Sequence, residues 1–195
     1  MANSSNANGA RTRMITEGGL CIALSIVLSF LKIPIGLSFG GFGGSIDLVM
    51  VPLVIYALKW GTGWGIAGGF IFGTLKYFLS SGAVIHWISI IFDYSVAYAA
   101  VGLAGLFMLK DKAPGAAKSA LAAFVGCLGR FLIHFISGVT VYAEWMPEEF
   151  LSHKMTSPAV YSLLYNGTYM LPNTILCVAV VALLAVPLRR LYMSK

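Results

Sequence analysis

Six apolar segments joined by short polar connections constrain this chain more than any other feature of its sequence. They cover residues 17–35, 46–60, 63–79, 85–109, 116–142 and 159–188. A helix needs about 20 largely apolar residues to cross a bilayer, and fewer when its neighbours shield its ends. The chain is 58% hydrophobic and only 10% charged, whereas soluble domains carry about 25% charged residues. We therefore expect an all-α integral membrane protein with six transmembrane helices.

Basic residues at the ends of these segments predict how the chain crosses the membrane, because cytoplasmic connections carry an excess of lysine and arginine. One set of alternate connections holds nine such residues, and the other holds Lys32, Lys76 and Lys154. We therefore place both termini in the cytoplasm and expect a multi-pass protein of the plasma membrane. Residues 1–13 are expected to form a polar tail and residues 14–195 a single six-helix domain. The net charge of +6 then reflects topology and not nucleic-acid binding.

The sequence contains no pattern typical of a metal centre, a disulfide framework or a nucleotide site. Cys21, Cys127 and Cys177 lie in apolar segments without Cys-x-x-Cys spacing, so we interpret them as small buried hydrophobic residues. The glycine-rich residues 36–45 lack the Gly-Lys-Ser/Thr ending of a phosphate-binding loop. We interpret this segment as a connection that either folds over a site or only joins two helices. No cofactor is expected, and the chain cannot use ATP by itself.

Polar side chains of the fourth, fifth and sixth segments are expected to meet at one depth. At about 1.5 Å of rise per residue, Asp93 and His134 lie about 12 Å inside the outer ends of their segments. Asn166 descends through the same outer half of the sixth segment, together with a stripe of tyrosines, Tyr161, Tyr165 and Tyr169. Ionisable groups inside a membrane are costly and usually functional. A pocket open to the outside is therefore predicted here.

The chemistry of these groups favours an aromatic cation as the ligand. Arg130, His134, Gly138 and Tyr142 recur at every fourth position, so they share one face of the fifth segment. Aromatic rings attract cations and stack on flat heterocycles. A lone carboxylate such as Asp93 is most stable opposite a positive charge.

Each of these residues also has a purely structural interpretation. Asp93 could form an ion pair with Arg130, or Arg130 could cap backbone carbonyl groups. His134 could be an interhelical hydrogen-bond donor. Tyr142 and Tyr161 could belong to the aromatic belt at the outer membrane interface. These residues alone leave the alternatives open.

A pair of small residues in the first segment forms a surface that another helix can approach closely. Gly19 and Ala23 are four positions apart, which is the small-xxx-small pattern of helix packing in membranes. The pair could serve packing within the bundle. If it faces outward, it could instead dock another membrane subunit.

Four stretches of the sequence form a specific combination. They are TEGGLCIALSIVLSF near the start, the Asp93-Tyr94 pair, RFLIHFISG at residues 130–138 and YSLLYNGTYMLP at residues 161–172. Together they resemble the thiamine-specific substrate-binding (S) component of energy-coupling factor vitamin transporters, over nearly the whole chain. The resemblance implies a six-helix protein that binds thiamine with high affinity from outside. It also implies that a membrane coupling subunit and two ATPase subunits act with it.

The resemblance implies roles for individual residues as well. Asp93 would meet the thiazolium ring, and the other thiamine-binding residues would be Tyr94, His134, Tyr142, Tyr161 and Asn166. Gly19 and Ala23 would dock on the coupling subunit, where Gly replaces the Ala of the family pattern. Some members of the family have Glu at the position of Asp93 and Trp at that of Tyr142. The reach of the acid and the stacking area would therefore differ in this chain.

Two other functions stay open at this point. An S component for another vitamin or a pyrimidine would keep the fold and change the residues around the ligand. An intramembrane enzyme could use His134 and Asp93 as an acid/base pair, although no serine or cysteine nucleophile stands beside them in an obvious motif. A self-sufficient channel would need a ring of like charges or a repeated filter segment, which the sequence lacks. We expect a transport subunit and not an enzyme.

Overall fold

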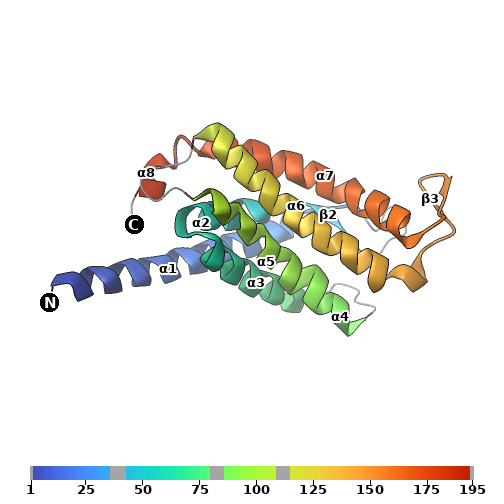
Figure 1. Ribbon diagram of the computed structural model, residues 1–195, viewed down its shortest axis with the longest axis horizontal. Helices are drawn as coiled ribbons and strands as arrows, with labels where there is room; N and C mark the ends of the chain where they lie inside the picture. The colour runs from blue at the N-terminus through green and yellow to red at the C-terminus, as the bar shows by residue number, and fades with distance from the viewer. Residues whose placement is uncertain (1, 36–42, 80–85, 109–114, 194–195) are drawn as a thin grey trace.

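Helices form nearly all of the computed structural model, which describes residues 2–35, 43–79, 86–108 and 115–193 (Figure 1). The longer helices are α1 (Ala2–Phe30), α2 (Met50–Trp60), α3 (Thr62–Leu79), α6 (Ala116–Thr140) and α7 (Pro158–Leu184). Four consecutive short elements make one further helix: α4 (Trp87–Ser89), the π-helix η2 (Ile90–Val96), α5 (Ala97–Val101) and the 3-10 helix η3 (Gly102–Phe107). The short helices η4 (Ala143–Trp145) and α8 (Arg189–Met193) follow α6 and α7.

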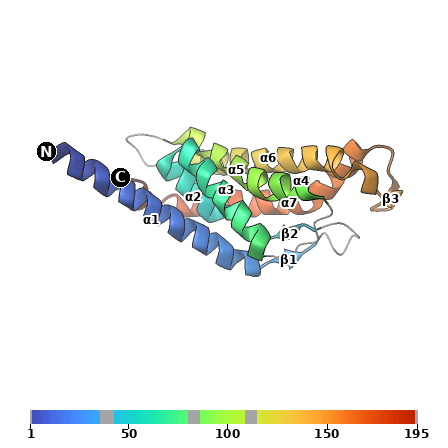
Figure 2. The same ribbon diagram turned by 90° about the horizontal axis from the view of Figure 1, so that it is seen from below.

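Two short antiparallel hairpins complete the described structure. Strand β1 (Ile33–Pro34) pairs with β2 (Ser45–Ile46), and β3 (Glu149–Phe150) pairs with β4 (His153–Lys154). Figure 2 shows β1 and β2 beyond the end of α1. Both chain ends lie at the end of the bundle opposite to β3 (Figure 1). Most of the glycine-rich segment at residues 36–45 falls outside the described residues, so its predicted position over the site is not described.

The structure is mostly helical, as the sequence predicts for a membrane protein, although it also contains the two short hairpins. Four described helices are long and apolar enough to cross a membrane: Asn8–Phe30, Trp87–Phe107, Ala116–Thr140 and Pro158–Leu184. Helix α2 has only 11 residues, because residues 45–46 belong to β2 and the helix begins at Met50. The number of membrane crossings and the side of the termini stay predictions.

Glycines bring α3 against the fourth helix at very short range. A side chain at Gly69 would collide with the backbone of Tyr98, and one at Gly73 would collide with that of Tyr94. Helix α3 accordingly packs along η2, α5 and η3. The contact fixes the backbone that carries Asp93.

A π-helical turn, η2, interrupts the fourth helix of the bundle. It includes Asp93 and Tyr94, so the residue that we expect to bind the ligand lies within it. Turns of this kind are rare and often mark functional sites, because they shift side chains relative to a regular helix.

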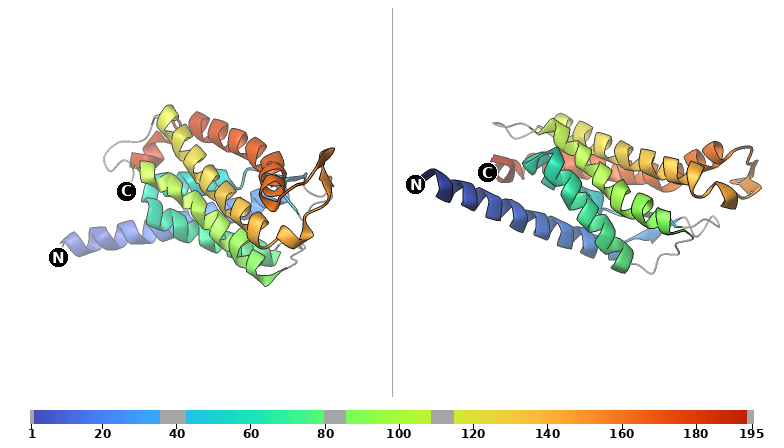
Figure 3. Two further views of the ribbon diagram at one scale, coloured as in Figure 1. Left: turned by 45° about the vertical axis from the view of Figure 1, so that its right-hand side comes forward. Right: turned by 60° about the horizontal axis from the view of Figure 1, so that its bottom comes forward.

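Helices α6 and α7 pack against each other, and Figure 3 shows their ribbons running side by side. The buried core lies between α2 and the helices around it, and its large side chains include Met50, Leu53, Phe72 and Tyr98. The core therefore occupies the end of the bundle near the termini. The polar residues of the candidate site lie toward the opposite end.

Helix α1 packs on α2 and α3, and its N-terminal part projects beyond the bundle (Figures 1 and 2). It includes residues 2–13, which the sequence analysis set apart as a tail. Glu17 holds α1 to α2 through Lys59 and Trp60, at 2.7 and 2.9 Å. Gly19 and Ala23 are exposed on the outward face of α1. The small-residue pair is therefore not used for packing within the described bundle.

Candidate functional site

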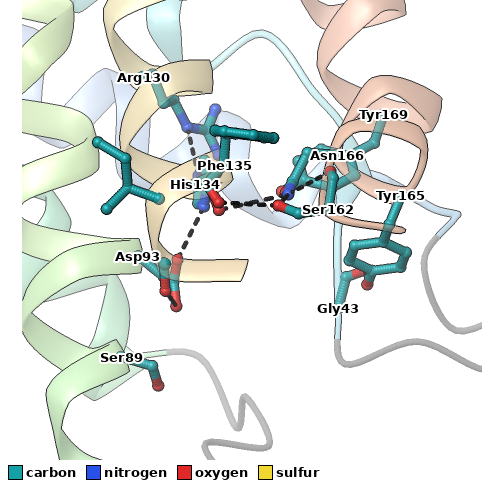
Figure 4. Close-up of polar contacts among 12 residues, drawn as sticks. Gly43, Ser89, Asp93, Arg130, His134, Phe135, Ser162, Tyr165, Asn166 and Tyr169 are labelled. Atoms are coloured by element: carbon teal, nitrogen blue, oxygen red, sulfur yellow. Dashed lines mark hydrogen bonds and ion pairs between the residues drawn. The ribbon is translucent and has the colours of Figure 1, made fainter. Parts of the chain in front are cut away.

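Asp93, His134 and Arg130 form a continuous hydrogen-bonded row between η2 and α6 (Figure 4). His134 Nδ1 lies 3.1 Å from Asp93 Oδ1, and Arg130 Nε lies 3.2 Å from His134 Nε2. Arg130 and His134 are four residues apart on α6, so one helix face supplies both. The sequence analysis predicted that Asp93 and His134 meet, and the structure brings them into direct contact.

The row defines the tautomer of His134. The guanidinium N–H of Arg130 can only donate, so Nε2 of His134 must be the acceptor. Nδ1 then carries the proton and donates it to Asp93. Arg130 consequently reaches Asp93 through His134, and the predicted alternative of a direct Asp93–Arg130 ion pair is wrong. The structure also gives Arg130 partners other than backbone carbonyl groups. Its Nε donates to His134, and its guanidinium carbon lies 4.1 Å from the ring centroid of Tyr98.

The carboxylate of Asp93 is held from two sides and stays partly open. Ser137 Oγ donates to its Oδ2 at 3.0 Å, while His134 donates to Oδ1. The side chain of Asp93 is still 16% exposed. A carboxylate can accept about four hydrogen bonds, so it keeps free lone pairs for a ligand. The sequence analysis missed Ser137, which its position three residues after His134 on the same helix face could have revealed.

Asn166 connects α7 to the backbone of α6. Its side-chain nitrogen lies 3.4 Å from the carbonyl oxygen of His134 and donates to Ser162 O at 2.9 Å. Ser162 in turn donates to the carbonyl oxygen of Phe135 at 2.9 Å (Figure 4). The close approach of α6 and α7 at this level depends on Gly138, because any side chain there would collide with that of Ser162. The predicted proximity of His134 and Asn166 is therefore present.

The tyrosine stripe of α7 divides into two environments. Tyr169 lies edge-on to His134, with ring centroids 6.0 Å apart, and its hydroxyl donates to Asn166 Oδ1. Tyr161 lies nearer the N-terminal end of α7. Its ring is stacked on that of Tyr165 and edge-on to that of Phe150. Tyr161 is thus buried beneath the β3–β4 hairpin, and Tyr169 is the tyrosine that contacts the polar row.

Tyr94 and Tyr142 each lie against another aromatic ring near the candidate site. Tyr94 contacts the ring of Tyr77, with centroids 5.4 Å apart. Tyr142 follows the end of α6 and lies edge-on to Trp145 at 6.3 Å. Tyr142 is outside the candidate span, and burial raises the pKa of its phenol to about 12. Its phenol therefore stays neutral at physiological pH.

Tyr165 links the sixth apolar segment to the end of the glycine-rich connection. Its hydroxyl donates to the carbonyl oxygen of Gly43 (Figure 4). Gly44 lies against the ring of Tyr169, where a side chain would collide with that ring. The end of the glycine-rich segment is thus held next to the polar row.

This arrangement suits binding better than acid/base catalysis. Arg130 occupies the lone pair of His134, and Ser137 donates its hydroxyl to Asp93 and not to an imidazole. His134 is therefore not placed as a base that activates Ser137 as a nucleophile. Within the same residues, no group of three or more His, Cys, Asp or Glu side chains could hold a metal ion. Buried Arg130 also has a donor, Nη1, with no protein partner in the described structure. A ligand acceptor or a water can satisfy this donor.

The fold and the site define a membrane protein in which a partly exposed carboxylate, that of Asp93, lies near aromatic rings. The chain belongs to the thiamine transporter protein family (Thia_YuaJ), whose sequence model matches residues 15–193. This match confirms the family to which the sequence motifs pointed. It also classes the chain as a multi-pass membrane transport protein and not as an enzyme.

Two relatives and one solved structure agree with this assignment. The thiamine transporter ThiT of Bacillus subtilis is 31% identical over 160 residues, which are 78% of this chain and 80% of the relative. ThiT of Lacticaseibacillus paracasei is 27% identical over 195 residues, 93% of this chain and 91% of the relative. A structure of ThiT from Listeria monocytogenes has the same fold, with a TM-score of 0.78 at 20% identity, covering 94% of this chain and 98% of the other.

Proposed function

We propose that this chain is the thiamine-binding membrane subunit of an ATP-driven uptake transporter of the energy-coupling factor type. The observation that carries the proposal is the carboxylate of Asp93, which is fixed by His134 and Ser137 but still partly exposed. Thiamine is an aromatic cation, and its thiazolium ring needs a counter-ion inside an otherwise apolar site. Family membership supports thiamine as the ligand over other vitamins and pyrimidines.

Each neighbour of Asp93 has a proposed part in holding thiamine. Asp93 pairs with the thiazolium, and the neutral ring of Tyr142 stacks on the ligand with Tyr94 beside it. His134 and Asn166 supply hydrogen bonds to its polar edge. Tyr161 takes part in stacking once the β3–β4 hairpin moves aside, because Phe150 covers Tyr161 in this structure.

The proposed topology has six membrane crossings and both termini in the cytoplasm. The chain ends lie together at the end of the bundle opposite to β3 (Figure 1), which is consistent with an even number of crossings. Asp93, His134 and Asn166 then open toward the outside. The short helix α2 completes the bundle because the helices around it cover nearly all of its side chains.

Transport requires partners that supply energy, which we propose to be a membrane coupling subunit and two ATPase subunits. The exposed pair Gly19 and Ala23 on α1 is the proposed docking surface for the coupling subunit. Its neighbours Leu20, Leu24 and Val27 are all more than half exposed. Small residues among large apolar ones let a second helix approach closely within the membrane.

Titration of the purified chain with thiamine, read by tryptophan fluorescence, tests the proposed site. Asp93→Asn keeps the size of the side chain and removes its charge. Loss of a buried charged contact costs about 2 to 5 kcal/mol of binding free energy, so this variant should bind thiamine at least about 30-fold more weakly. Glu144→Gln removes an exposed carboxylate in the connection after α6 and serves as the matched control. Equal affinities of the two variants would refute the role of Asp93.

A further inference from the structure

A second buried polar cluster lies directly beside the candidate site. Asp47 precedes α2, and its Oδ2 lies 3.5 Å from Nζ of Lys76 on α3. Ser45 Oγ and the backbone N–H of Val49 also donate to this carboxylate, at 3.1 and 3.3 Å. The side chain of Asp47 is only 1% exposed. Asn173 of α7 binds the backbone of Asp47 and of Ser45.

Tyr98 joins this cluster to the site. Lys76 Nζ donates to the hydroxyl of Tyr98 and lies 4.9 Å from the centroid of its ring. The guanidinium of Arg130 lies 4.1 Å from the same centroid. Two cations therefore share one aromatic ring, and one of them donates to His134.

The charges of the combined cluster balance. Asp47 and Asp93 supply two negative charges, and Lys76 and Arg130 supply two positive charges. His134 is neutral in the tautomer that its hydrogen bonds define. Because Asp47 lies next to Lys76, its negative charge offsets much of the repulsion that Lys76 would exert on a cation bound at Asp93.

We infer that Asp47 determines the preference of this site for a cationic ligand, although it does not belong to the ligand-contacting set. The inference rests on the proposed function. With Asp47 neutral, Lys76 and Arg130 would share Asp93 as their single nearby carboxylate among the described residues. An unbalanced positive charge would then repel the thiazolium. Charges about 10 Å apart in protein interact strongly enough to change an affinity by about tenfold.

The test compares thiamine with an analogue in which carbon replaces the thiazolium nitrogen, so that the ring is neutral. Asp47→Asn keeps an oxygen acceptor for the N–H of Val49 and removes the charge. We expect this variant to bind thiamine about tenfold more weakly than the wild type. Its affinity for the neutral analogue should change less than about threefold, because the repulsion acts only on charge.

Glu17→Gln is the matched control, since it also removes the carboxylate partner of a buried lysine, Lys59, at 2.7 Å. It should leave unchanged the ratio of the affinity for thiamine to the affinity for the neutral analogue. Asp47→Glu keeps the charge and should also keep the ratio. The double variant Asp47→Asn with Lys76→Met restores the charge balance, so its ratio should return toward that of the wild type.

Two results would overturn the inference: an equal loss of affinity for both ligands in Asp47→Asn, or a double variant whose ratio stays low. Should Asp47→Asn fail to fold, Lys76→Met decides the matter, because it leaves the charge of Asp47 without its lysine partner. The affinity for thiamine relative to the neutral analogue should then rise above that of the wild type, and an unchanged ratio would contradict the inference. A wild-type chain that does not bind thiamine would instead refute the proposed function. The two failures are therefore distinguishable.

Discussion

Gly138 sets the distance between α6 and α7 at the level of the site, and Gly138→Ala tests this directly. The new Cβ would collide with Ser162, whose own Cβ would lie 2.8 Å away. Turning Ser162 would move its Oγ but not its Cβ, so the two helices must also separate, and such overpacking costs about 1 to 3 kcal/mol. Ser162 then loses or weakens its bonds with Phe135 and Asn166, each worth about 1 kcal/mol. We expect a total cost of about 2 kcal/mol.

Thermal unfolding in detergent measures this cost, with Gly167→Ala on α7 as the control. A side chain at Gly167 would meet no atom within 4 Å, and both variants gain the same helix propensity of up to about 1 kcal/mol. We expect the Tm of Gly138→Ala to lie about 4 to 8 °C below that of the control. Thiamine affinity should also fall, because Asn166 moves away from His134. Equal Tm and equal affinity in the two variants would refute this account of the helix contact.

Two further predictions concern the surfaces around the site. Gly19→Leu should leave thiamine binding by the purified chain unchanged but abolish thiamine uptake by cells, because it blocks the proposed docking face. Gly9→Leu, on the projecting part of α1 where no atom would meet the new Cβ within 4 Å, is its control, and equal uptake by both would contradict the docking role. Tyr165→Phe removes the donor to the carbonyl of Gly43. It should speed thiamine dissociation in stopped-flow experiments, and an unchanged rate would show that this contact does not retain the ligand.

Residue spacing predicted those parts of the site that depend on helix periodicity alone. Arg130 and His134 meet because residues four apart share a helix face. Asn166 lies within reach of Tyr169 because residues three apart are also neighbours on a helix surface. The depth of Asp93 and His134 followed from counting residues inward from the segment ends. These relations hold in any regular helix, so they can be recognised in a sequence.

Other features depend on contacts between segments and could not be predicted. The π-helical turn at η2 changes the direction of side chains locally, and no residue in it signals this change. The β3–β4 hairpin places Phe150 on Tyr161, which hides a residue that we expected to be open to the ligand. Lys76 was assigned to an outer connection, yet it lies within α3 and pairs with Asp47. Only the fold reveals that partner, 29 residues away in the sequence.

The most direct test of the central claim is calorimetric titration of the purified wild-type chain, without any partner, with thiamine and with its neutral-ring analogue. We predict saturable binding of thiamine to one site, with the analogue at least about tenfold weaker because it cannot pair with Asp93. Equal affinity for the two ligands would show that the carboxylate does not recognise the thiazolium. Absence of thiamine binding by folded protein would contradict the proposed function itself.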